Sequence, residues 1–197
     1  MTIAPPPPSL DFWTYERYMA TPIEGRFEII EGALHQMASP IWTHQIGVIN
    51  LAFEFMVYQR AKKNGQTMIA PSDILIRRFP RLRTRQPDLF YVSLEQLAKT
   101  GGPPKKGPLT IGPELVVEII SNSETAAMLE GKTQDYIEID VQEMWRVWLE
   151  TRTVDVVELS AAGAKVLQSY GEGETIVSRV FPDLSVAVSA IFAVPVV

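Results

Sequence analysis

A carboxylate in the middle of an apolar segment is the first feature of this sequence that could do chemistry. Residues 115–120 read Leu-Val-Val-Glu-Ile-Ile, and this density of aliphatic side chains predicts a strand that is covered on both faces. Side chains alternate along a strand, so Glu118 should share its face with Val116 and Ile120. An ionised carboxylate is costly to bury without compensation. We therefore expect Glu118 to meet a metal ion, a basic side chain or a solvent cleft, with a structural salt bridge as the plainer alternative.

A second carboxylate, Asp88, begins another apolar run. It follows Pro87, which can start a strand but cannot donate a ladder hydrogen bond, and it should face the same way as Phe90 and Val92. A lone Asp after Pro is more often a turn or cap residue. Two carboxylates at the ends of neighbouring strands, however, form a hard-oxygen site suited to Mg²⁺ or Mn²⁺. The pairing of Asp88 with Glu118 therefore favours a metal site.

Lys132 is the third candidate. It lies in a helix expected over 123–139, at the margin of an inward stripe that contains Leu129 and Tyr136. A Lys at this position can bury its stem and bring its ammonium group toward the preceding strand. A solvated surface Lys is the alternative.

Composition limits the other chemistry. The chain has 197 residues, 46% of them hydrophobic and 21% charged, which suits one ordinary folded domain. It has no Cys, which excludes disulfides, a thiolate zinc site and a cysteine nucleophile. The two His, His35 and His44, are too few for a multi-histidine metal site. An enzyme of this composition has to use carboxylates, a Lys or a hydroxyl. No Gly-rich phosphate loop or dinucleotide fingerprint appears, so no nucleotide cofactor is expected.

The N-terminal residues MTIAPPPPSL have neither a basic nor an apolar segment typical of a secretory signal. Four consecutive prolines predict an extended, flexible leader over 1–9, followed by a single domain over 10–197. Apolar stretches are far shorter than the roughly 20 residues that span a bilayer. No membrane association and a cytoplasmic location are therefore expected.

Charge is distributed unevenly along the chain. The net charge is −5, but residues 1–110 hold 13 basic and 9 acidic residues, whereas residues 111–197 hold 5 and 14. The basic residues are concentrated in a short arginine-rich stretch, which comprises Arg77, Arg78, Arg81, Arg83 and Arg85. An acidic chain can still present a local basic surface, so this stretch is a candidate for nucleic-acid binding. A solvated edge or hairpin tip is the alternative.

The remaining pattern predicts the elements that must position these residues. Helices are expected over 10–19, 43–63, 123–139 and 184–192; a hairpin over 27–37; and strands over 67–71, 73–78, 87–92, 114–120, 143–149 and 154–159. The helix over 43–63 has apolar residues all round and should be buried on more than one side. Trp13 and Trp42 should anchor the leader and this helix to the sheet. The order of elements predicts an α/β or α+β fold with a mixed sheet flanked by helices.

Several segments, taken in order, resemble the Uma-two family of restriction endonucleases, within the PD-(D/E)XK nuclease superfamily. The matching segments are residues 27–34, His44, residues 85–89, residues 113–121, Lys132, Tyr136 and residues 143–145. The resemblance extends over about residues 10–193. It implies a restriction-endonuclease-like fold and a metal-dependent phosphodiesterase that acts on DNA, commonly as a homodimer.

The resemblance also implies roles for single residues. Asp88 would match the metal-binding Asp, and Glu118 the acidic residue of the E-x-K half-motif, with one or two Mg²⁺ or Mn²⁺ ions as cofactor. Ile120 occupies the usual Lys position, and Lys132 matches a Lys that has moved to the following helix. Glu28 matches a further acidic position. The accessory positions match His44, Gln86 and Tyr136.

Two departures from the family pattern leave other functions open. Residues 121–123 are Ser-Asn-Ser where the family has Ser-Pro-Ser, and Met128 replaces a common Asp. A metal-dependent endonuclease is the leading hypothesis. The first alternative is a nuclease-fold module that binds nucleic acid or protein without cutting. The second is a carboxylate-pair hydrolase that needs no metal. For a homodimer, the apolar C-terminal strands are the only hint within the sequence.

Overall fold

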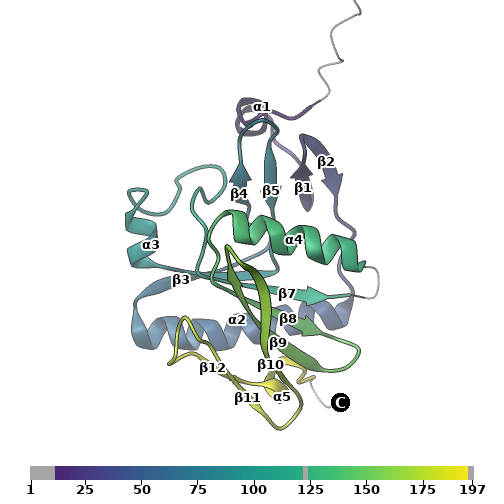
Figure 1. Ribbon diagram of the computed structural model, residues 1–197, viewed down its shortest axis with the longest axis vertical. Helices are drawn as coiled ribbons and strands as arrows, with labels where there is room; N and C mark the ends of the chain where they lie inside the picture. The colour runs from purple at the N-terminus through teal and green to yellow at the C-terminus, as the bar shows by residue number, and fades with distance from the viewer. Residues whose placement is uncertain (1–11, 122–123, 195–197) are drawn as a thin grey trace, which may run out of the picture.

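A mixed six-stranded sheet forms the centre of the molecule (Figure 1). The computed structural model describes residues 12–121 and 124–194, so the leader expected over 1–9 lies outside the described residues. The strand order is β10-β9-β8-β7-β6-β3. The bounds are β3 Gly65–Ile69, β6 Leu89–Ser93, β7 Leu115–Ile120, β8 Glu143–Trp148, β9 Thr153–Ser160 and β10 Gly163–Tyr170. The expected mixed sheet is confirmed.

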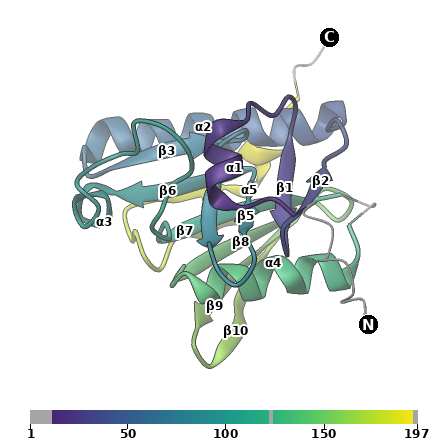
Figure 2. The same cartoon turned by 90° about the horizontal axis from the view of Figure 1, so that it is seen from above.

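The two faces of this sheet are covered by different helices. β7 and β8 run parallel and are joined by α4 (Ala126–Glu138), while the other neighbouring strands pair antiparallel. Figure 2 shows α2 (Trp42–Lys62) on one face and α4 on the other. Leu115, Val117 and Ile119 pack in the cluster on the α2 side. Val116 packs with Tyr136 of α4 in the other cluster, which places Glu118 on the α4 face.

A smaller layer stands beside the main sheet. It contains α1 (Tyr15–Ala20) and two hairpins, β1 (Phe27–Ile30) with β2 (Ala33–Gln36), and β4 (Ile74–Arg77) with β5 (Arg83–Arg85). Its own core is formed by Phe27, Ile29, Leu75 and Leu82, and Trp13 packs against this core. The expected first hairpin is confirmed. Neither β5 nor the short helix α3 (Leu94–Ala98) was expected from the sequence.

One face of α2 is exposed, which corrects the expectation that this helix is buried on more than one side. Leu51 and Phe55 are buried against the sheet. Four apolar side chains lie on the exposed face, and we call them the α2 stripe: Ile49, Phe53, Met56 and Val57. Trp42 is 80% exposed, so it does not anchor the helix to the sheet. An apolar helix pattern predicts burial but does not say which face a neighbour covers.

The C-terminal segment completes the core on the α2 side. The expected helix over 184–192 divides into a strand, β12 (Ser185–Ala187), which pairs with β11 (Thr175–Val177), and a short helix, α5 (Val188–Ile191). Most apolar side chains of this segment are buried in the main core, among them Ile176, Val186 and Ile191, whereas Val177 is exposed. Among the described residues, no helix has the length and apolarity that crossing a membrane requires.

Candidate active site

The candidate site lies where β6 and β7 separate. The β6–β7 ladder ends at the pair Leu89–Val117, and Pro87, two residues before Leu89, has no N–H to continue it. β7 continues alone with β8 as far as Ile120. Asp88 takes over the lost pairing, because its Oδ2 accepts the Ile119 backbone N–H at 2.9 Å. Asp88 and Glu118 therefore flank the last ladder pair, one on each strand.

Two further side chains hold Asp88, which is 5% exposed. His44, in the first turn of α2, places Nε2 at 3.1 Å from Oδ2, and Arg26 donates to Oδ1 at 3.2 Å. Burial acts to raise the pKa of Asp88, but His44, the Ile119 amide and the charge of Lys132 together keep this pKa below its usual value. Gly47 lets α2 approach β7 closely, because a Cβ there would lie 3.2 Å from the Ile119 side chain. Asp88 is thus held as an ionised carboxylate.

Glu118 is fully enclosed on the α4 face of the sheet. Lys132 Nζ lies 2.7 Å from its Oε2, and the Tyr136 hydroxyl donates to its Oε1. Burial raises the pKa of Glu118 to about 7, opposed by the charge of Lys132 and assisted by that of Asp88. Lys132 also pairs with Glu124 at 2.8 Å. Burial acts to lower the pKa of Lys132, but the two carboxylates raise it well above its usual value, which keeps the ammonium group charged.

Glu28 belongs to a buried ion network next to this pair. Arg85 donates to Glu28 at 2.6 Å and to Asp135 of α4 at 2.6 Å, and its side chain is 6% exposed. The backbone N–H of Gln86 also donates to Glu28, at 3.2 Å. The Gln86 amide group points elsewhere and donates to Asp73 at 2.7 Å. Glu28 is therefore joined to the candidate site through neighbouring residues, without a hydrogen bond to Asp88 or Glu118 among the described contacts.

The arginine-rich stretch does not form one basic surface. Arg83 bonds to Asp135 and pairs with Glu31, and Arg77 pairs with Glu31 and Glu138. Arg85 lies inside the protein, which corrects its assignment as a surface contact for nucleic acid. Only two members of the stretch are exposed without an ion pair among the described residues: Arg78 and Arg81.

Three residues next to the candidate site were missed by the sequence analysis. Arg26 had a detectable signal, because it stands two residues before Glu28 and so faces the same side of the strand. Asp135 is three residues after Lys132, on a neighbouring part of the α4 surface, but nothing in the pattern indicated that an Asp would be buried. Glu124 precedes the first turn of α4, and no local signal pointed to it.

The carboxylate oxygens of the candidate site suit a hard divalent cation, although few carboxylates lie there. Among the residues that are described, no three His, Cys, Asp or Glu side chains gather to hold an ion. Mg²⁺ is usually bound by one or two carboxylates, with water and substrate phosphate completing its shell. Asp88 and Glu118 meet that need, and no sulfur or multiple imidazole ligands compete. The residues present therefore fit Mg²⁺ or Mn²⁺.

Comparisons with known proteins agree with this architecture. The fold is shared with a crystal structure described as "a putative nuclease belonging to DUF820 from Anabaena variabilis ATCC 29413", with a TM-score of 0.73 and 15% sequence identity over 91% of this chain and 97% of that chain. The chain belongs to the Uma2 family, whose model, described as "Putative restriction endonuclease", matches residues 14–189. No curated protein matches the chain. The resemblance noted in the sequence is confirmed.

Proposed function

We propose that this protein is a divalent-metal-dependent endonuclease that hydrolyses phosphodiester bonds in DNA. The observation that carries the proposal is the position of Asp88 and Glu118 on either side of the last β6–β7 pair, where the charge of Asp88 acts on Glu118, with Lys132 Nζ at 2.7 Å from Glu118. Membership of a restriction endonuclease family supports the same reaction class. Asp88, Glu118 and Lys132 are the residues we assign to it.

Asp88 and Glu118 are the residues that would hold Mg²⁺ or Mn²⁺. When bound, such an ion supplies Lewis acidity to a phosphate oxygen and lowers the pKa of a bound water. Protein donors fix the orientation of both carboxylates. Arg26, His44 and the Ile119 N–H orient Asp88, while Tyr136 fixes one oxygen of Glu118.

Lys132 supplies a positive charge next to Glu118, and this charge also acts on Asp88. The ammonium group of Lys132 is charged, its side chain is 8% exposed, and its pairs with Glu118 and Glu124 fix its position. In this position Lys132 would orient the attacking water or offset the charge that develops on the phosphate. Glu28 acts on the site indirectly in this proposal, by holding Arg85 and the Gln86 backbone.

One observation favours a second candidate function, a module that binds without cutting. The oxygens of both carboxylates already have protein donors, namely Arg26, His44, the Ile119 N–H, Lys132 and Tyr136. An ion must displace some of these donors. The metal-independent carboxylate-pair hydrolase is less well supported, because it requires no Lys at the acidic pair, and Lys132 is bonded to Glu118.

Nicking of supercoiled plasmid in Mn²⁺ distinguishes these functions. We expect the unaltered protein to nick, Asp88→Asn and Glu118→Gln to lose activity by at least about a hundredfold, and Glu138→Gln, which alters an exposed carboxylate of α4, to retain it. Equal nicking by the unaltered protein and Asp88→Asn would contradict the endonuclease proposal. Metal-independent hydrolysis that Asp88→Asn abolishes would support the hydrolase, and tight DNA binding without nicking would support the module.

We also propose that the protein forms a homodimer in which the α2 stripe packs against that of a second copy. Each side chain of the stripe is at least 43% exposed. Contiguous exposed apolar surface of this kind marks protein–protein contacts. A standard interface buries about 800 Å² per partner, more than four side chains supply, so polar neighbours would contribute the rest.

A further inference from the structure

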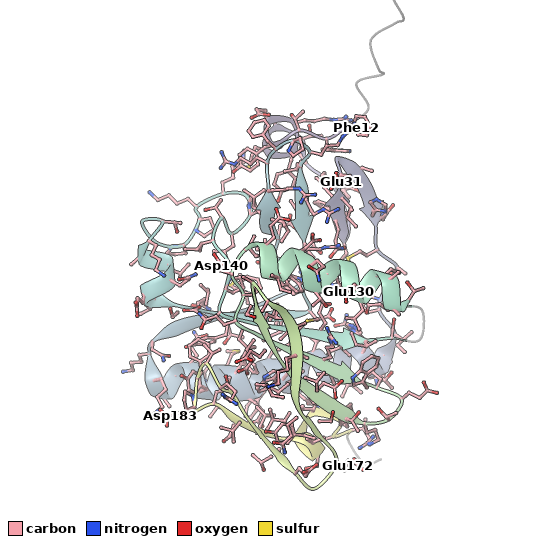
Figure 3. All side chains as sticks on the ribbon, in the orientation of Figure 1. Phe12, Glu31, Glu130, Asp140, Glu172 and Asp183 are labelled. Atoms are coloured by element: carbon pink, nitrogen blue, oxygen red, sulfur yellow. The ribbon has the colours of Figure 1, made fainter. Side chains whose placement is uncertain are left out.

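The tip of the β4–β5 hairpin combines charge and exposed aromatic surface in a way that the proposed cleavage site does not use. The connection between the two strands reads Arg78-Phe79-Pro80-Arg81-Leu82. Phe79 is 77% exposed between two exposed arginines. Figure 3 places Phe12, which contacts this tip, at the end of the molecule far from Glu172.

Both tip arginines are held in place without losing their hydrogen-bond donors. Arg78 stacks over the ring of Tyr15 at 3.9 Å, and Arg81 over the ring of Phe12 at 3.6 Å. Stacking orients a guanidinium group while leaving its N–H groups free. Neither arginine pairs with a carboxylate among the described residues, whereas Arg77 and Arg83, a few residues away, do. The two guanidinium groups are thus arranged to receive an anion from outside.

The tip is a rigid platform. Leu82 is 1% exposed and packs with Phe27, Ile29 and Leu75. Its carbonyl accepts the Gly32 N–H at 2.9 Å, which ties the tip to the first hairpin. A cavity of about 280 Å³ next to Arg78 and Arg81 leaves room beside both guanidinium groups. Phe79 is therefore presented to solvent by an ordered support.

The tip is also within reach of a duplex that occupies the proposed cleavage site. Arg81 and Asp88 are seven residues apart in the sequence, so their Cα atoms are separated by at most about 25 Å. That span corresponds to about seven base-pair steps of roughly 3.4 Å. Proteins that bind the minor groove often combine basic side chains with an apolar wedge that unstacks a base step.

We propose that the β4–β5 tip is a second contact with duplex DNA, in which Arg78 and Arg81 hold backbone phosphates and Phe79 enters the minor groove and wedges between base pairs. This inference rests on the DNA substrate of the proposed function. It adds a bending contact away from the cleavage chemistry, and it predicts preference for base steps that unstack easily.

Duplex binding, measured by fluorescence anisotropy in EDTA so that no cleavage occurs, tests the two contacts separately. Arg78→Gln/Arg81→Gln should lower the slope of log K against log salt by about 1.8, the value for two lost phosphates. Phe79→Ala should weaken binding about tenfold. The matched controls are Lys165→Gln/Arg179→Gln for charge and Leu94→Ala for exposed apolar surface, and both should bind like the unaltered protein.

Insertion of Phe79 between base pairs is measured with duplexes that carry the fluorescent base 2-aminopurine at successive positions, because unstacking raises its fluorescence. The fluorescence should rise at one step with the unaltered protein and with Leu94→Ala, but not with Phe79→Ala. The unaltered protein could cleave and bind DNA while the tip variants bind as tightly as their controls. That result would overturn the tip contact and leave the nuclease proposal intact. Absence of duplex binding by the unaltered protein in EDTA, together with nicking in Mn²⁺, overturns the tip contact and leaves the nuclease intact. Absence of both binding and nicking overturns both proposals. If a tip variant changes the sedimentation of the purified protein without changing DNA binding, the tip contacts another copy of the chain, and the DNA contact is overturned.

Discussion

The Asp88 carboxylate accepts the backbone N–H of Ile119 at 2.9 Å, across the point where β6 and β7 part. A side chain therefore satisfies a buried donor that a longer β6 strand would otherwise pair. The same oxygen contacts His44. Asp88 Oδ2 satisfies the Ile119 backbone donor and also belongs to the acidic pair. A substitution of Asp88 therefore affects both the stability of the sheet end and the candidate site.

Substitutions of Asp88 should separate these two roles. Asp88→Ala leaves the Ile119 N–H without its acceptor, so we expect a loss of about 1–3 kcal/mol of unfolding free energy. Asp88→Asn keeps an oxygen in reach of that N–H, so it should lose much less stability while still losing nicking activity. Urea unfolding of the three proteins measures the difference. Equal stability of Asp88→Ala and the unaltered protein would count against the structural role.

The raised pKa of Glu118 should make stability fall as the pH rises. Between pH 4.5, the usual pKa of a Glu carboxyl, and about 7, the folded protein keeps a proton that the unfolded chain has released. Unfolding free energy therefore decreases across this window. Asp88 does not oppose the trend, because its lowered pKa confines its effect to more acidic solutions.

Glu118→Gln, which cannot ionise, provides the comparison. Between pH 5 and 8 the unaltered protein should lose about 2 kcal/mol more unfolding free energy than the variant. Urea unfolding at both pH values, without divalent ions, gives this difference. Parallel pH profiles for the two proteins would show that Glu118 does not carry the linked proton.

Removal of the Lys132 ammonium group should cost stability as well as activity. Lys132→Met leaves Glu118 buried without its cation, and breaking such a pair costs about 3–5 kcal/mol. The loss should be smaller at pH 5 than at pH 8, because at pH 5 Glu118 carries a proton and needs no cation. Urea unfolding at both pH values tests this, with Lys165→Met, an exposed Lys of β10, as control. A loss that is independent of pH would point to packing of the Lys stem instead.

Arg85 should behave as an internal residue. Arg85→Met leaves Glu28 and Asp135 without their shared cation, and we expect a loss of about 3–5 kcal/mol. Arg78→Gln, at the exposed tip, should change unfolding free energy by less than about 0.5 kcal/mol. Chemical unfolding of the two variants makes the comparison. Similar small effects would restore Arg85 as a surface residue.

Charge placed on the α2 stripe should prevent self-association. Phe53 is 65% exposed, so Phe53→Glu removes little buried surface and should leave the unfolding free energy nearly unchanged. Sedimentation equilibrium should give a dimer for the unaltered protein and for Lys165→Gln, and a monomer for Phe53→Glu. A monomer in all three would contradict the homodimer.

The sequence predicted what depends on local pattern. Alternation along residues 115–120 correctly placed Leu115 and Val116 in the clusters on opposite faces, and the hairpin expected over 27–37 is formed by β1 and β2. It did not predict which arginines are exposed. Arg85 finds its partners Glu28 and Asp135 at 57 and 50 residues along the chain, and such long-range pairings leave no local trace. The roles of Asp88, Glu118 and Lys132 stay predictions.

The carboxylates and guanidinium groups of Glu28, Arg85, Asp135, Arg83 and Glu31 alternate in charge from the first hairpin to α4. Glu28 and Glu31 reach Asp135 only through Arg85 and Arg83 of β5. The network therefore ties the first hairpin to α4 through the strand between them, although about 90 residues of chain separate the two segments.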